Sequence, residues 1–217
     1  MNSLRKYALC MVTTAVAGIS VPASAQLPLT LDGFTTGQYV IHVTNPLVNY
    51  THYGAMPADS PLGAARATYF GAGPNPFHQI STLDVREGHF VVDSGFGSVA
   101  AVQVGYGFSL SGAEVPLGLN LEGYSAFRLN FAGIATSESM VVVITVWPHS
   151  GGYYDFEVVL PPNGNAFSVV FPFSGFNKGG GGGGLTQADV SNIDAIVWQA
   201  QGGGFDSFGL TSFQAVN

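Results

Sequence analysis

After residue 26 the sequence consists mainly of short apolar or alternating runs separated by Gly, Pro, Asn and Ser. Alternation with a period of two residues is typical of β-strands, and frequent turn residues leave little room for a helical period. We therefore expect an antiparallel β protein with one helical turn, at residues 185–190. The predicted strands are residues 38–44, 64–70, 89–93, 99–106, 126–132, 139–147, 153–160, 166–171, 193–199 and 205–213.

Strands without a helical layer can bury their apolar sides only against one another. A two-sheet antiparallel jelly-roll β-sandwich or a barrel satisfies this requirement. The long irregular connection at residues 107–124 breaks the even hairpin spacing of an up-and-down barrel, and so favours the sandwich. No internal repeat divides the chain, so residues 26–217 are expected to form a single β-sandwich domain.

The segments 139–147 and 153–160 indicate which side of the sheet is buried, because their even-numbered positions are apolar. A five-residue turn at 148–152 would place Trp147 opposite Tyr153, Thr145 opposite Asp155 and Val143 opposite Glu157. The same register pairs Val146 with Tyr154 and Ile144 with Phe156 on the apolar side. Both segments thus agree on the buried side without any change of register.

This register brings aromatic and acidic side chains together on the outer side: Trp147, Tyr153, Thr145, Asp155 and Glu157. Sugar C–H groups stack on aromatic faces, and sugar hydroxyls donate to carboxylates, so we predict that these residues bind a glycan. Two further candidate ligand residues are Arg128, expected on the same polar side one strand away, and Trp198. Alternatively, Trp147 and Tyr153 only stabilise the hairpin or lie under a loop.

Residues 1–25 have the order of a secretory signal peptide. Arg5 and Lys6 precede an apolar stretch at 7–19, and Ala-Ser-Ala stands at 23–25. A buried N-terminal helix is the alternative interpretation. We expect export to the periplasm or the extracellular space, with cleavage after Ala25.

Cleavage would leave four basic residues against 13 acidic ones, a formal charge of −9. Such an acidic surface disfavours nucleic acid and anionic lipid as partners. The single cysteine, Cys10, would leave with the signal, so the mature chain would have no disulfide and no cysteine nucleophile. This composition suits a bacterial envelope or secreted protein, and no apolar run after the N-terminal segment is long enough to span a membrane.

Two blocks resemble galactose-binding-like jelly rolls, especially family 11 carbohydrate-binding modules and the complex I intermediate-associated protein domain. They are LNLEGYSAFRLNF at 119–131 and IDAIVW at 193–198 followed by FDSF at 205–208. LDGF at 31–34 and LGAAR at 62–66 are similar to the early strands of these domains, although Gly63-Ala64-Ala65 replaces their usual double glycine. The resemblance extends over most of residues 31–213.

The resemblance implies non-catalytic glycan binding on a sheet face or rim, sometimes with a structural calcium. Calcium sites of this kind join the first and last strands, which makes Asp32 and Asp206 candidates, although each is also a good turn residue. No calcium ligand set can be matched position by position, and no cofactor is otherwise indicated.

Signs of catalysis or of transition-metal binding are weak. Asp155 and Glu157 lie on one face of a strand and could act as the acid and nucleophile of a glycosidase, but outward acids on a strand are usually solvated. The glycine run 179–184 lacks the order of a phosphate-binding loop and is interpreted as a flexible surface loop. The histidines lack close metal-ligand spacing: His42, His52, His78, His89 and His149.

Three functions remain open from the sequence. The first is a secreted, monomeric, non-catalytic protein that binds a polysaccharide or other glycan. The second is a structural or adhesive envelope protein whose sheet face binds another protein. The third is a glycan-cleaving enzyme that uses Asp155 and Glu157.

Overall fold

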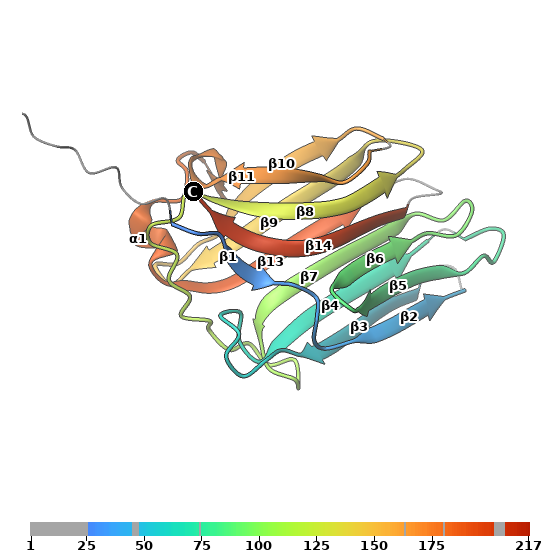
Figure 1. The fold of residues 1–217 in the computed structure, drawn as a ribbon, viewed down its shortest axis with the longest axis horizontal. Coiled ribbons are helices and arrows are strands. Elements are labelled where there is room, and N and C mark those ends of the chain that lie inside the picture. The colour runs from blue at the N-terminus through green and yellow to red at the C-terminus, as the bar shows by residue number, and fades with distance from the viewer. Residues whose placement is uncertain (1–25, 45–47, 74, 163, 180, 202–206) are drawn as a thin grey trace, which may run out of the picture.

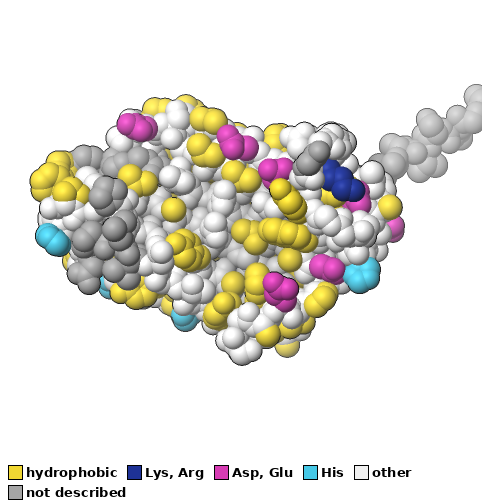
Figure 2. Space-filling model, turned by 180° about the vertical axis from the view of Figure 1, so that it is seen from behind, with side chains coloured by type: hydrophobic (Ala, Val, Ile, Leu, Met, Phe, Trp, Pro, Cys, Tyr) yellow, Lys and Arg dark blue, Asp and Glu magenta, His cyan; other side chains and the backbone are white. Residues whose placement is uncertain are grey.

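The computed structural model describes residues 26–44, 48–73, 75–162, 164–179, 181–201 and 207–217. Two antiparallel sheets pack face to face; sheet A faces the viewer in Figure 1, and Figure 2 shows the outer side of sheet B. Sheet A contains, in spatial order, β11 (Phe167–Pro172), β8 (Ala126–Ala135), β14 (Ser207–Val216), β6 (His89–Asp93), β5 (Ser81–Arg86) and β2 (Tyr39–Val43), with β1 (Leu29–Asp32) paired to β14.

Sheet B contains, in spatial order, β12 (Asn177–Lys178), β10 (Tyr154–Leu160), β9 (Met140–Pro148), β13 (Ile193–Gln201), β7 (Ala100–Phe108), β4 (Ala65–Ala72) and β3 (Val48–Ala55). The helical elements of the described residues are short: η1 (Phe173–Gly175) and α1 (Gln187–Val190). The predicted β-sandwich is therefore confirmed, as is the helical turn. No helix in the described part of the chain is long and apolar enough to cross a membrane.

All ten predicted segments lie on strands, and β6 has the predicted bounds; residues 205 and 206 of the last segment lie outside the described residues. The structure adds β1, β3, β5 and β12. β3 is an edge strand whose sequence, VNYTHYGA, has no apolar alternation to reveal it. β5 does alternate, with Leu83 and Val85 fully buried, so its signal was present but overlooked.

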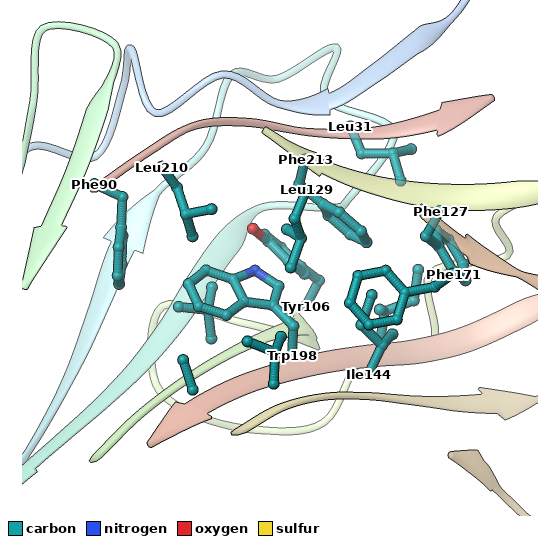
Figure 3. Close-up of a cluster of buried hydrophobic side chains, with 14 of the residues drawn as sticks. Leu31, Phe90, Tyr106, Phe127, Leu129, Ile144, Phe171, Trp198, Leu210 and Phe213 are labelled. Atoms are coloured by element: carbon teal, nitrogen blue, oxygen red, sulfur yellow. The ribbon is translucent and has the colours of Figure 1, made fainter. Parts of the chain in front are cut away.

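The core is the space between the two sheets, where the inward side chains of both layers meet. Figure 3 shows Leu129, Leu210 and Phe213 of sheet A facing Trp198 and Tyr106 of sheet B. The fully buried Trp198 ring makes a T-shaped contact with Phe90, with centroids 5.1 Å apart. Such aromatic pairs add to the free energy gained from burying their area.

The β9–β10 hairpin has the predicted register. Val146 pairs with Tyr154 and Ile144 with Phe156 on the inner side, while Thr145 pairs with Asp155 and Val143 with Glu157 on the outer side. The even-numbered residues of β9 are buried, whereas Trp147 and Glu157 are exposed. This register positions the candidate site.

A buried ion pair joins the first strand of sheet A to sheet B. Arg66 on β4 donates to both carboxylate oxygens of Asp32, from Nε to Oδ2 at 2.6 Å and from Nη2 to Oδ1 at 2.8 Å. The Tyr106 hydroxyl donates to Oδ2 at 2.8 Å, and the Phe34 amide donates to Oδ1 at 2.8 Å. Burial acts to lower the pKa of Arg66, but the hydrogen bonds and charge of Asp32 outweigh it and raise that pKa.

These contacts show that Asp32 is a turn residue as well as an ion-pair partner. Both of its oxygens already accept hydrogen bonds from protein donors. Asp32 therefore does not fit the role of a calcium ligand, and Asp206, the other candidate, lies outside the described residues.

Replacement of Asp32 should destabilise the fold strongly, because it would leave the guanidinium of Arg66 buried without a counter-charge. We expect Asp32→Ala to lower the free energy of unfolding by about 3–5 kcal/mol, measured by urea denaturation. The control is Asp84→Ala, which removes the 2.6 Å pair with the exposed Arg86 and should cost less than about 1 kcal/mol. Equal losses in the two variants would contradict this role for Asp32.

Alkaline pH should weaken the fold through Tyr39, whose hydroxyl donates to Thr68. Burial raises the pKa of Tyr39 from its ordinary value of 10.0 to about 12. Between these two pKa values the unfolded chain loses the Tyr39 proton and the folded chain keeps it. The contribution of Tyr39 to the free energy of unfolding is therefore fully present below pH 10 and falls as the pH rises toward 12. The urea midpoint should therefore drop between about pH 10 and about pH 12, and drop less in Tyr39→Phe. An identical drop in the variant would exclude Tyr39 as a source.

Candidate functional site

The outer side of the β9–β10 hairpin carries the candidate site. We call Thr145, Trp147, Tyr153, Asp155 and Glu157 the aromatic–acidic face. Successive residues of a strand point to opposite sides of a sheet, so the five residues lie on the side away from the core. The Trp147 and Tyr153 side chains are 36% and 46% exposed, and their ring centroids are 6.4 Å apart with planes tilted by 39°. The predicted pair is therefore formed at the surface.

The carboxylates of this face are free to accept hydrogen bonds from a ligand. Asp155 is opposite Thr145 on β9 and Asn177 on β12, so Asn177 extends the face by one strand. Glu157 is exposed and lies opposite Val143. Within the part of the chain that the structure describes, neither Asp155 nor Glu157 forms an ion pair.

A row of side chains continues from Glu157 across sheet B. The register aligns Glu157 with Val143, then with Gln199 on β13, Gln103 on β7 and Tyr69 on β4. These five residues line a groove of about 560 Å³, which we call the polar groove. Gln103 Nε2 donates to Gln199 Oε1 at 2.9 Å, so the two amides are held in one orientation.

Sequence reasoning missed Tyr69, Gln103 and Gln199. The alternation did indicate that the two glutamines point away from the core. Gln103 lies between the buried Val102 and Val104, and Gln199 lies between the buried Trp198 and Ala200. What it did not contain was the order of strands in the sheet, which brings residues 69, 103 and 199 beside residue 157.

A second groove, of about 480 Å³, lies at the other end of the face beside Trp147, and we call it the turn groove. It is lined by the β9–β10 turn, including His149, by the connection after β7, including Glu114, and by β13, including Asp194. His149 Nδ1 lies 3.1 Å from Asp194 Oδ2, so this pair forms one wall. Trp147 thus lies on the aromatic–acidic face and also lines this groove.

Apolar and acidic side chains occupy different parts of this side of the molecule. Figure 2 shows apolar side chains in its middle and acidic ones around them, with the basic colour confined to one edge. No Lys or Arg is among the described residues that line the two grooves.

Comparison with known proteins finds no matching family model and no matching curated protein. Solved structures of similar fold include the family 11 carbohydrate-binding module of a cellulosomal cellulase of Clostridium thermocellum. It is 10% identical, the match covers 89% of this chain and 96% of the module, and the TM-score is 0.41. The family predicted from the sequence is thus among the structures found.

Two further structures are similar. One is a mutant family 29 carbohydrate-binding module complexed with mannohexaose, at 12% identity, covering 78% of this chain and 91% of the module, with a TM-score of 0.34. The other is an agarase, at 13% identity, covering 80% of this chain but 26% of the enzyme, with a TM-score of 0.41. At such low identity, what this surface binds has to be inferred from its own residues.

Two predicted ligand residues are wrong. Trp198 is fully buried in the core, because the register of β13 turns residues 196, 198 and 200 inward. Arg128 does alternate with buried residues, but β8 belongs to sheet A, so the side chain lies on the opposite side of the sandwich. There it donates from Nε to Gln214 Oε1 at 3.0 Å. Alternation predicted the side of the strand correctly but not the sheet to which the strand belongs.

The histidines are not gathered into a metal site. Among the described residues, no group of three or more His, Cys, Asp or Glu side chains is placed to hold a metal ion. His42 is instead 3.1 Å from Thr82 Oγ1.

The two tryptophans should respond differently to truncation. Trp147→Ala removes an exposed ring and should change the free energy of unfolding by about 1 kcal/mol or less. Trp198→Ala opens a cavity in the core and should cost about 3–5 kcal/mol. Urea denaturation of both variants measures the difference; a large loss in Trp147→Ala would mean that its ring serves packing rather than contact with a ligand.

Proposed function

We propose that the aromatic–acidic face and its two grooves bind a glycan chain, and that the protein is a non-catalytic, exported binding protein. The observation that carries this proposal is the pair of exposed rings, Trp147 and Tyr153, beside Asp155 and Glu157, whose carboxylates form no ion pair with any described residue. The C–H faces of a sugar stack on aromatic rings, and its hydroxyls donate to carboxylates and amides. Both partners are present on one surface.

The shape of the surface favours a chain over a single sugar. The polar groove crosses the sheet from β4 to β10, through β7, β13 and β9. Neighbouring strands lie about 4.8 Å apart, so these four intervals span about 19 Å. An oligosaccharide lying across the strands would contact Gln103 and Gln199 in this groove. To reach the rings it would have to continue along β10 from Glu157 toward Tyr153, a distance of four residues or about 13 Å.

The charge of the surface favours a glycan without acidic groups. Glu157 and Glu138 line the polar groove, Glu114 and Asp194 line the turn groove, and no Lys or Arg is among the described lining residues. An anionic polysaccharide would meet carboxylates in both grooves and no Lys or Arg among their described lining residues. We therefore expect uncharged glycans to bind in preference to uronic-acid chains.

The test is a binding measurement on the full chain. Hexasaccharides of glucose, mannose and galactose should include at least one ligand, while a uronic-acid hexasaccharide should not bind. Trp147→Ala should weaken that binding by at least about tenfold. The matched control is Phe77→Ala. Phe77 is also exposed and contacts another ring, Phe96, but it lies in the connection between β4 and β5 and lines neither groove.

Other outcomes of the same measurement would contradict the proposal. If no glycan binds, or if Trp147→Ala and Phe77→Ala weaken binding equally, the face does not bind glycans in this way, and the adhesive alternative gains support. Release of reducing sugar that disappears in Glu157→Gln would instead favour the glycosidase.

A further inference from the structure

The two exposed rings stand at opposite ends of one turn. Trp147 precedes it on β9 and Tyr153 follows it, with residues 148–152 between them. Gly151 and Gly152 have φ of 93° and 79°, a conformation that favours glycine. The distance and tilt between the rings therefore depend on how this turn is held.

Asp189 holds the turn from the inner side. Its buried carboxylate lies at the third position of α1 and completes a capping box with Thr186, accepting from the Thr186 amide at 3.0 Å. The same carboxylate accepts from Ser150 Oγ at 3.0 Å and from the Tyr154 hydroxyl at 3.2 Å. Ser150 is the middle of the turn and Tyr154 is the first residue of β10, so Asp189 fixes positions on both sides of Tyr153.

Asp189 is ionised at neutral pH. Burial acts to raise the pKa of its carboxyl, but hydrogen bonds from Thr186, Ser150 and Tyr154 outweigh burial and lower that pKa. The carboxylate is thus available as an acceptor for all of these donors. A backbone hydrogen bond also holds the turn, since the His149 amide donates to the Asn192 carbonyl at 2.9 Å.

Gly179 determines where the Tyr153 ring lies. The Gly179 amide donates to the Tyr153 carbonyl at 2.9 Å. A Cβ atom at residue 179 would come within 2.3 Å of Tyr153 Cζ, so the ring packs directly against the glycine backbone. The first glycine of the run that sequence analysis interpreted as a flexible loop therefore has a steric role beside the candidate site.

We propose that Asp189 and Gly179 are positioning residues for the glycan face, holding Trp147 and Tyr153 at the spacing that a sugar chain requires. For its ligand the inference rests on the proposed function. A preformed pair of rings loses less side-chain freedom on binding, and this raises affinity without adding a contact.

The first test needs no glycan. Amide hydrogen exchange of residues 149–152 is measured in the full chain for wild type, Asp189→Ala and Asp189→Asn. Exchange in the turn should rise about tenfold or more in Asp189→Ala, with the strands of the core unchanged. Asp189→Asn should retain most of the protection, because its amide can still bond to the hydroxyls of Ser150 and Tyr154 and to that of Thr186, whose Oγ1 donates to Asp189 at 2.7 Å. Unchanged exchange in Asp189→Ala would overturn the proposal.

The second test measures affinity for whichever neutral hexasaccharide the wild type binds. Asp189→Ala and Gly179→Ala should each weaken binding about tenfold. The glycine control is Gly33→Ala, where the nearest atom to an added Cβ is 3.7 Å away, and it should bind as the wild type does. Unchanged affinity in both Asp189→Ala and Gly179→Ala would overturn the proposal.

If Asp189→Ala does not fold, Ser150→Ala removes the turn contact alone and should show the same gain in exchange and loss of affinity; wild-type behaviour in that variant would overturn the proposal. If the wild type binds none of the glycans, the proposed function fails, and the exchange measurement still decides whether Asp189 holds the turn.

Discussion

The structure depends on the packing of two sheets through their inward side chains. Each strand that contributes to the core presents every second residue to the other layer, as Ile144 and Trp198 do from sheet B toward Phe213 and Leu210 of sheet A. Burial of this apolar area is the main source of stability in a β-sandwich. It also fixes register, because a shift by one residue would turn every inward side chain outward. The outward positions, including Trp147 and Glu157, are set by the same constraint.

Charge is distributed in two contrasting ways. Inside, the Asp32 carboxylate is matched by Arg66 and by the Tyr106 hydroxyl, so that no charge of this group is left without a partner. Outside, the carboxylates that line the grooves of sheet B have no Lys or Arg among them in the described residues. The inner group therefore stabilises the fold, whereas Asp155 and Glu157 of the outer face form no ion pair within the described residues.

The candidate site is assembled from both local and distant residues. The hairpin contributes Trp147 and Tyr153 through a short turn, while Gln103 and Gln199 reach the same surface from strands far away in sequence. Side chains on neighbouring segments then hold the rings: Asp189 of α1 lies behind the turn and Gly179 lies against Tyr153. The surface is thus shaped by contacts from its inner side and its edge.

The sequence by itself determined ten of the fourteen strands of the described residues, together with the inward side and the register of the β9–β10 hairpin, because these follow from local alternation and a short turn. That was enough to place Trp147, Tyr153, Asp155 and Glu157 on one outer surface. Only the tertiary structure decided which strands are neighbours and which sheet each joins, because those choices depend on contacts between residues far apart in the chain. For that reason Arg128 was assigned to the wrong side and Gln103 was missed. Trp198 is a different case. It alternates with Gln199, so the local pattern already indicated that its ring points inward, between the two sheets.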